Sequence, residues 1–340
     1  MQAVEISAPG EARLVERPEP RPGPSEALLR VRRIGYCGTD LSTYRGVNPL
    51  VSYPRIPGHE IAATIEALGP AVSGPWQVGQ DVLVMPYTSC GACSACRWGR
   101  PNCCASNQTL GVQRDGALAQ WIVAPTAKLL AAPGLSLAEL ALVEPLTIGF
   151  HAMRRARVVA GETVAVIGCG AIGLGVIAGA RFRGAAAIAV DVDDAKLDVA
   201  RACGADHAIN FHRESLHERL LELTAGLGPQ VVVEAVGLAA TYTTALAEAT
   251  FAGRVVCLGY AKAPFEVDSK LVVLKELDVL GSRNALPDDF ADVAGMLSRG
   301  GFPSERIVTH VVPLAAAPDA MRRWSEQPGE VTKIQVDLDR

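Results

Sequence analysis

ETVAVIGCGAIG, residues 162–173, decides the fold of the second half of this chain. Its first part, Glu162–Gly168, is rich in β-branched and small residues, which is typical of a buried strand. The turn GCGAIG that begins at Gly168 matches the pattern G-x-G-x-x-G, and Ala171–Arg183 continues as a helix of small residues. A strand, a glycine turn and a helix in this order are typical of a dinucleotide-binding unit.

Each glycine of the turn has a separate role in such a unit. Gly168 would make the tight turn, Gly170 would let a pyrophosphate approach the backbone, and Gly173 would let the helix pack against the strand. The N–H groups of Ala171 and Ile172, at the helix N-terminus, would then face the phosphates. These five residues are the predicted phosphate-binding residues.

An acidic residue closes the next predicted strand. The predicted strand Ala185–Val190 is followed by Asp191. The spacing from Gly173 to Asp191 is close to the spacing of about 20 residues expected for a carboxylate that binds the ribose hydroxyls. A carboxylate there repels a 2′-phosphate, and Val192–Asp194 adds negative charge but no arginine. The sequence therefore favours NAD over NADP. The alternative is an ordinary strand–turn–helix with a solvated aspartate at its end.

The rest of the chain separates into regions that differ in their pattern of predicted strands and helices. After the glycine turn, predicted helices and strands alternate: Asp194–Cys203, Val231–Glu234, a helix through Tyr242–Thr250, and Arg254–Leu258. Such alternation predicts an α/β domain with a doubly wound parallel sheet, at residues 146–275. Residues 1–145 carry short strand-like runs such as Ala27–Ile34 and Ile61–Leu68, which indicates a β-rich barrel or sandwich. The alternation weakens again over residues 276–340.

Length and composition limit the classes of protein. A chain of 340 residues exceeds what one hydrophobic core usually serves, and 49% hydrophobic with 20% charged residues is ordinary for a globular protein. The formal net charge of -4 gives no basic surface for nucleic acid or an anionic membrane. The N-terminal MQAVEISAPG shows no secretory signal, and apolar runs fall far short of the ~20 residues of a membrane helix, so a cytoplasmic location is expected.

Five of the nine cysteines crowd into one short segment. Cys90, Cys93, Cys96 and Cys104 supply four thiols, and four thiolates form a closed, structural type of zinc site. Cys103 is adjacent to Cys104 and could replace it as the fourth ligand. An iron–sulfur cluster is possible by ligand type, whereas disulfides are disfavoured without export.

A second set of potential ligands lies in GYCGTD at 35–40 and GHE at 58–60. Cys37 and His59 together supply a soft ligand and an imidazole, and Glu144 could add an oxygen. Three protein ligands leave a fourth position for water or substrate, which is the arrangement of a catalytic zinc. Thr39 could pass on a proton from a zinc-bound hydroxyl, and Asp40 could orient His59. Taken separately, a lone cysteine and a lone histidine are more often core residues.

These motifs together resemble the zinc-dependent medium-chain dehydrogenases of the alcohol dehydrogenase superfamily over nearly the whole length. The matching segments are GYCGTD, GHE, the four-cysteine lobe at about 88–106, Glu144-Pro145-Leu146, and GCGAIG with Asp191. The resemblance implies a GroES-like catalytic domain at 1–145, an NAD-binding Rossmann domain at 146–275, and a return of 276–340 to the catalytic domain. It also implies two zinc ions per chain, NAD as cofactor, and a homodimer or homotetramer.

The resemblance assigns roles to individual residues. Cys37, His59 and Glu144 match the catalytic zinc ligands, and Glu60 matches a nearby carboxylate that can approach the ion. Thr39 matches the relay hydroxyl, and outside the zinc site Lys196 matches a lysine near the adenosine ribose. Weaker matches are Arg283, for a carboxylate or phosphate, and Lys333, for the pyrophosphate.

Two positions at which this sequence departs from the family pattern narrow the expected function. Glu144 stands where alcohol-oxidising relatives usually have cysteine, an exchange similar to the sorbitol, threonine and sugar-acid dehydrogenase branch. Ser42 stands where many relatives have a histidine that releases the relayed proton. Cys37–Glu60 is most similar to sugar-acid and polyol oxidoreductases such as bacterial L-galactonate dehydrogenases. We therefore expect oxidation of a small polyol, sugar or sugar acid. The alternatives are an L-threonine 3-dehydrogenase-like enzyme and a non-catalytic NAD-binding redox sensor.

Overall fold

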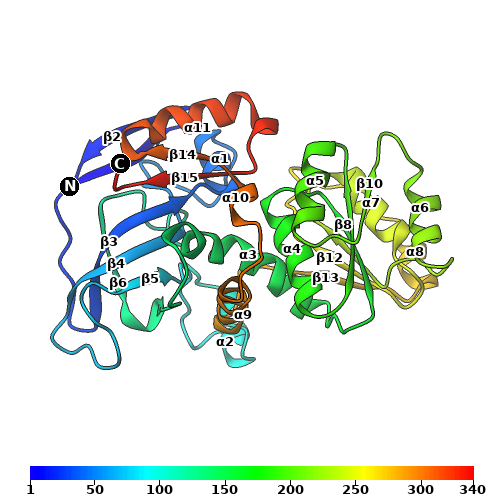
Figure 1. The fold of residues 1–340 in the computed structure, drawn as a ribbon, viewed down its shortest axis with the longest axis horizontal. Coiled ribbons are helices and arrows are strands. Elements are labelled where there is room, and N and C mark those ends of the chain that lie inside the picture. Colours follow the sequence, from blue (N-terminus) through cyan, green and yellow to red (C-terminus); the bar gives the residue numbers. More distant parts are fainter. The chain divides into compact units, whose positions relative to one another are not determined.

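The computed structural model describes the whole chain, Met1 to Arg340, which divides into two compact units (Figure 1). Unit 1 comprises residues 1–144 and 294–340, and unit 2 comprises residues 145–293. The first boundary thus lies between Glu144 and Pro145, beside the predicted one. The return to unit 1 begins at Ala294, later than the predicted residue 276, because residues 278–281 still form the edge strand of the unit 2 sheet.

Unit 1 is built around a seven-stranded sheet in which the order is β14-β15-β3-β4-β5-β7, with β6 also paired to β3. The hairpin of β1 and β2 forms a separate two-stranded sheet. The strands of unit 1 are β1 (Gln2–Ala8), β2 (Glu11–Glu16), β3 (Glu26–Gly35), β4 (Glu60–Leu68), β5 (Asp81–Val84), β6 (Trp121–Pro125), β7 (Leu129–Leu130), β14 (Val308–Pro313) and β15 (Lys333–Asp337). Its helices are α1 (Gly38–Tyr44), α2 (Ser94–Arg97), α10 (Ser304–Ile307) and α11 (Ala317–Glu326).

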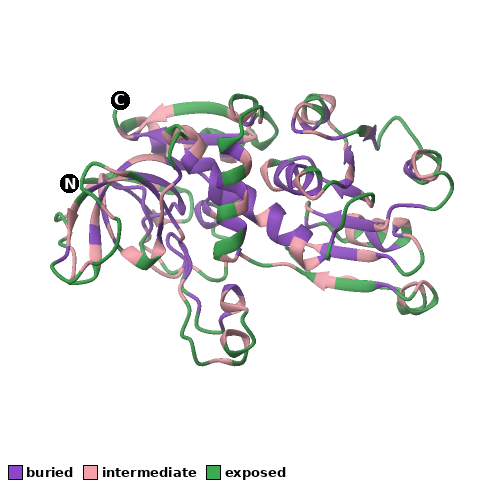
Figure 2. Cartoon of the chain, turned by 60° about the horizontal axis from the view of Figure 1, so that its bottom comes forward, coloured by how far each residue is buried: buried purple, intermediate pink, exposed green.

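One hydrophobic core serves unit 1 and includes residues from both ends of the chain. Alternate residues of β3, such as Leu29 and Val31, are buried in it, as are Ile334 and Val336 of β15. In Figure 2 purple buried residues lie in both strands and helices, and green exposed residues lie mostly in loops. The C-terminal strand is therefore an integral part of the first domain, since β15 pairs with β3.

Unit 2 is a doubly wound α/β domain with the strand order β10-β9-β8-β11-β12-β13, and every neighbouring pair is parallel. Its strands are β8 (Thr163–Ile167), β9 (Ala186–Asp191), β10 (His207–Asn210), β11 (Val231–Glu234), β12 (Arg254–Cys257) and β13 (Asp278–Gly281). Its helices are α4 (Ala171–Phe182), α5 (Asp194–Ala202), α6 (Leu216–Leu223), α7 (Ala239–Glu248) and α8 (Ser269–Leu274). The predicted fold class is confirmed. The winding reverses between β8 and β11, and ligands of such sheets bind beyond the carboxyl ends of the strands at that point.

Two helices, α3 (Leu137–Arg155) and α9 (Pro287–Ser298), cross the boundaries between the units. Helix α3 begins with a capping box, because the Ser136 N–H donates to the Glu139 carboxylate and the Glu139 N–H donates to the Ser136 hydroxyl. Within unit 2, buried Asp289 accepts a bond from Arg154 Nε at 2.7 Å and lies 2.7 Å from His151 Nδ1. This cluster ties α9 to α3. No helix combines the length and apolarity required to cross a membrane.

Candidate active site and cofactor site

The motif at residues 37–40 lies where β3 ends and α1 begins. Cys37 is the N-cap residue of α1, in an extended conformation. The fully buried Asp40 accepts hydrogen bonds from the Cys37 N–H at 2.8 Å and from the Gly58 N–H at 3.1 Å. Its Oδ1 is 3.8 Å from His59 Nδ1, which is beyond hydrogen-bond distance. Asp40 therefore positions Cys37 and the chain before His59 through backbone hydrogen bonds.

Glu60 is the first residue of β4 and lies opposite Gly35 of β3. Its carboxylate is fully buried, and a Cβ added to Gly35 would lie 1.8 Å from Oε2, so the carboxylate requires glycine there. Buried Lys333 of β15 donates to Glu60 Oε1 at 2.5 Å and to the Tyr36 carbonyl oxygen at 3.0 Å. Three strands thus hold this carboxylate. The lysine expected to reach a pyrophosphate is instead its ion-pair partner.

Glu144 lies in α3 and is buried. The hydroxyl of buried Tyr87 donates to Glu144 Oε1. Burial, and then the charge of Glu144, raise the pKa of Tyr87 well above its ordinary value, so its hydroxyl remains a donor. Tyr87 has no distinguishing motif in the sequence, and only the fold places its hydroxyl against Glu144.

Negative charge surrounds the imidazole of His59. Burial lowers the pKa of His59, but the charge of Asp40, and after it that of Cys37, outweighs burial and holds it well above its ordinary value. Glu144 acts in the same direction. Burial also raises the pKa of Glu60 to about 7, although Lys333 opposes that shift. This environment favours a bound cation.

The donor set fits a divalent metal ion. A thiolate, an imidazole and carboxylates are the ligands zinc takes in proteins. Two buried atoms of the cluster, His59 Nδ1 and Glu60 Oε2, have no hydrogen-bond partner.

The predicted relay hydroxyl lies next to this cluster. Thr39 Oγ1 is 3.7 Å from Cys37 Sγ, and the Thr39 side chain is partly exposed. Ser42, on the next turn of α1, is also partly exposed. A proton that reached Thr39 would therefore have access to water.

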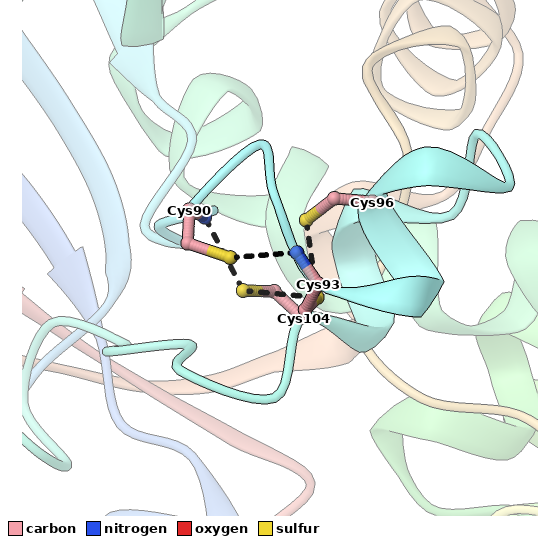
Figure 3. A group of neighbouring side chains, drawn as sticks. All are labelled: Cys90, Cys93, Cys96 and Cys104. Carbon is pink, nitrogen blue, oxygen red and sulfur yellow. Dashed lines mark hydrogen bonds between the residues drawn. The ribbon is translucent and has the colours of Figure 1, made fainter.

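The four-cysteine lobe forms a second, separate group (Figure 3). The Sγ atoms of Cys90, Cys93, Cys96 and Cys104 all lie within 4.8 Å of one another. Sulfur accepts from backbone N–H groups: that of Cys93 lies 3.3 Å from Cys90 Sγ, and that of Cys90 lies 3.3 Å from Cys104 Sγ. Backbone hydrogen bonds from Ala105 and Cys96 lower the pKa of Cys93 to about 6. The arrangement suits a four-coordinate zinc ion.

Cys103 does not belong to this group. Its sulfur is 3.8 Å from Arg100 Nη2. Of the two adjacent thiols, the buried one, Cys104, is the one that faces the other three. Cys103 is the last residue of a short 3₁₀ helix, Pro101–Cys103, and Cys104 is its C-cap.

The glycine turn has the geometry expected for a phosphate site. Gly168 has φ +97°, and a Cβ there would lie 2.6 Å from Val236 Cγ2. A Cβ on Gly173 would lie 1.9 Å from the Gly168 carbonyl oxygen, so only glycine permits the close packing of helix on turn. Gly170 faces open space and is an N-cap without a side-chain cap, which leaves the N-terminus of α4 accessible to an anion.

Asp191 lies at the carboxyl end of β9, as predicted. Its carboxylate accepts bonds from the Cys169 N–H at 2.7 Å and the Val192 N–H at 2.8 Å. It therefore also braces the glycine turn, a contact that spacing alone could not reveal. Lys196, in the first turn of α5, lies close enough to Cys169 to influence its pKa, which burial raises.

An arginine that the local sequence did not suggest lies next to this acidic segment. Arg213, which follows β10, pairs with Asp194 at 2.6 Å. Buried Asn210 donates to the same carboxylate at 2.6 Å. Beside Asp191, the positive charge of Arg213 is therefore balanced by Asp194.

Comparisons with known proteins identify the class. A model described as "Alcohol dehydrogenase GroES-like domain" matches residues 23–134, and one described as "Zinc-binding dehydrogenase" matches residues 171–299. The chain belongs to the zinc-type medium-chain dehydrogenases, which are nicotinamide-dependent oxidoreductases, and to their sugar and polyol branch.

Its relatives include the L-galactonate-5-dehydrogenase of Escherichia coli K12, 33% identical over 95% of this chain and 95% of that protein. The sorbitol dehydrogenase of Bacillus subtilis is 32% identical over 99% of this chain and 97% of that protein. Among solved structures, an Escherichia coli alcohol dehydrogenase complexed with NADH has a TM-score of 0.92 at 30% identity, covering 99% of each chain. A Sinorhizobium meliloti zinc-binding dehydrogenase bound to NADP has a TM-score of 0.91 at 29% identity, covering 99% of this chain and 98% of that one.

Proposed function

We propose that this enzyme transfers a hydride from a secondary alcohol of a polyol, sugar or sugar acid to NAD. The observation that supports it best is the cluster of half-buried Cys37 with buried His59 and Glu144, in which a negative environment surrounds an imidazole. We propose these three residues as ligands of a catalytic zinc, with Glu60 as an additional carboxylate. The thiols of the four-cysteine lobe would hold a second, structural zinc.

The residues of the chain have distinct tasks in this proposal. When bound, zinc would supply Lewis acidity that lowers the pKa of the substrate hydroxyl, and the nicotinamide would accept the hydride. Thr39 Oγ1 would take the hydroxyl proton and pass it to water, because Ser42 does not titrate near neutrality. Asp40 would hold the backbone of Cys37 and Gly58 in place, and Tyr87 would fix the orientation of Glu144.

The proposed preference for NAD rests on Asp191, whose negative charge would repel a 2′-phosphate. Solved relatives carry either NADH or NADP, so the cofactor requires a direct test. Replacing Asp191 with glycine should lower the ratio of kcat/KM for NAD over NADP. An unchanged ratio would remove this role from Asp191.

The decisive experiment for the reaction is NADH production across a panel of sugar acids, polyols and amino alcohols, including L-threonine. We expect turnover of a polyol, sugar or sugar acid, and loss of that turnover in Cys37→Ala. Turnover of L-threonine alone would favour the threonine dehydrogenase activity. No turnover, together with zinc only in the cysteine lobe, would favour a sensor.

The setting of the enzyme is part of the same proposal. None of the nine cysteines forms a disulfide, which suits a reducing compartment such as the cytoplasm. Strand β13 is the edge strand of the unit 2 sheet and is largely exposed, which supports association into a homodimer or homotetramer. Light scattering coupled to gel filtration would measure the number of subunits.

A further inference from the structure

Glu234 is a buried carboxylate that the proposed reaction does not use. It is the last residue of β11, lies opposite Ile167 of β8 and Cys257 of β12, and is fully buried. It therefore lies at the carboxyl edge of the sheet, where the winding reverses between β8 and β11. Ligands of doubly wound sheets bind at this edge.

The side chain of Glu234 holds the loop after β11. Its Oε1 accepts hydrogen bonds from the Val236 N–H at 2.9 Å, from the Gly237 N–H at 2.7 Å and from Thr241 Oγ1 at 2.7 Å. Bonds to an ionised acceptor are stronger than bonds between neutral groups. Residues 235–238 are thus fixed to the end of β11 by one oxygen atom.

The main chain of the same residue holds the loop after β12. The Glu234 carbonyl oxygen accepts from the Leu258 N–H at 2.9 Å and from the Gly259 N–H at 3.2 Å. A Cβ on Gly259 would lie 2.2 Å from the Gly237 nitrogen and 2.7 Å from Glu234 Oε2. The two loops, 235–238 and 258–260, therefore pack backbone to backbone over the Glu234 carboxylate.

The first of these loops also reaches the glycine turn. Val236 lies against Gly168, because a Cβ on that glycine would be 2.6 Å from Val236 Cγ2. Both loops present apolar side chains to solvent: Val236 is 44% exposed, Leu238 56% and Tyr260 82%. A dinucleotide whose ribose lies at Asp191 on one side of the switch point has its other half on the side of β11 and β12. The exposed apolar groups lie on that side.

We infer that Glu234 is the positioning residue for the nicotinamide half of the cofactor: it holds loops 235–238 and 258–260 in the conformation that receives this half. The inference rests on the proposed use of a nicotinamide dinucleotide by unit 2. Oε2 of Glu234 is buried without a hydrogen-bond partner. An unpaired buried oxygen costs free energy, and it belongs to the same carboxylate whose Oε1 fixes loop 235–238 and over which loop 258–260 packs.

The test is Glu234→Gln, studied by binding rather than turnover. The amide can keep the acceptor toward Val236 and Gly237, but it loses the charge and places an NH₂ group where Oε2 is buried unpaired. We expect the Kd for NADH, from protein-to-NADH fluorescence transfer, to rise about tenfold, which corresponds to about 1.4 kcal/mol. AMP lacks the nicotinamide half, so its Kd, measured by calorimetry, should differ by less than about twofold between Glu234→Gln and the wild type.

Glu162→Gln is the matched control at the opposite edge of the same sheet. Glu162 accepts from the Val159 N–H at 2.9 Å and pairs with Arg254, so its replacement also removes a half-buried charge from unit 2. We expect a lower Tm but unchanged Kd values for both ligands. Thr241→Val should weaken NADH binding partly, and Thr241→Ser, which keeps the hydroxyl, should restore it.

The outcomes separate the inference from the proposed function. Equal Kd values for NADH in the wild type and Glu234→Gln would overturn the inference and leave the proposed function intact. Parallel weakening of AMP and NADH would also overturn it, because the residue would then support the whole domain. A wild-type chain that binds neither NADH nor NADPH would overturn both.

Discussion

Replacing Lys333 with methionine tests the buried ion pair at the centre of the candidate metal site. The side chains of Lys333 and Glu60 are only 4% and 0% exposed, and their charged atoms are 2.5 Å apart. Methionine fills similar space but leaves Glu60 as a buried carboxylate whose Oε2 already has no partner. Removal of one member of a buried pair costs about 3–5 kcal/mol. For a unit of this size we expect Tm to fall by about 10 °C.

The loss should depend on pH in a defined direction. Burial raises the pKa of Glu60 to about 7, and Lys333 opposes that rise, so removal of the lysine raises the pKa further. A carboxyl group whose pKa is higher in the folded state than in the unfolded state loses stability as pH rises above its unfolded value of about 4.3. The variant should therefore be less destabilised, relative to wild type, at pH 6 than at pH 9. Differential scanning calorimetry at the two pH values measures this.

The control is Arg32→Met, which breaks the more exposed pair of Arg32 with Asp339, with side chains 27% and 30% exposed. Such pairs contribute about 0–1 kcal/mol, so Tm should hardly change. Glu60→Gln in the Lys333→Met background should recover part of the loss, because a neutral amide needs no cation. A Tm loss for Lys333→Met no larger than that of the control, or a further loss in the double variant, would show that this ion pair does not stabilise unit 1.

Three further outcomes are expected. Tyr87→Phe removes the hydrogen bond to Glu144, so zinc affinity at the candidate catalytic site should fall about tenfold, while chelator-driven release from the cysteine lobe keeps its wild-type rate. Elemental analysis should find one zinc fewer per chain in Cys104→Ser and the wild-type zinc content in Cys103→Ser. The reverse pattern would contradict the assignment of Cys104 as the fourth ligand. Asp289→Asn should cost about 3 kcal/mol near neutral pH. Burial raises the pKa of Asp289, but hydrogen bonds from its basic partners lower it overall, so its stabilisation is present above about pH 4 and is lost as pH falls through the lowered value. Urea unfolding with a cost that is constant from pH 7 to pH 3 would contradict this.

The local elements of unit 2 were predictable because each carries its own signal. The strand Val231–Glu234 and the helix start at Ala171 coincide with β11 and α4, since β-branched runs and glycine turns act over a few residues. The edge strand β13 was not predicted from the sequence. The predicted end of this domain, residue 275, therefore lies before β13. Its residues are largely exposed and lack the apolar run of the central strands.

The site was predictable in its motifs and not in its contacts. Cys37 and His59 follow from the pattern of ligand types, whereas the partners of Glu60 and Glu144 come from distant strands and loops. Lys333 and Tyr87 are ordinary in their local sequence and acquire their roles only when β15 and the loop after β5 pack beside the cluster. Arg213 likewise reaches Asp194 only because β10 pairs with β9.

Zinc-edge anomalous diffraction from crystals of the full chain would locate the metal ions. We expect two anomalous peaks per chain, one of them about 2.0–2.3 Å from ligand atoms of Cys37, His59 and Glu144. The other should lie among the four thiols of the cysteine lobe. A single peak in the lobe, or a second peak away from those three side chains, would rule out the proposed catalytic zinc site.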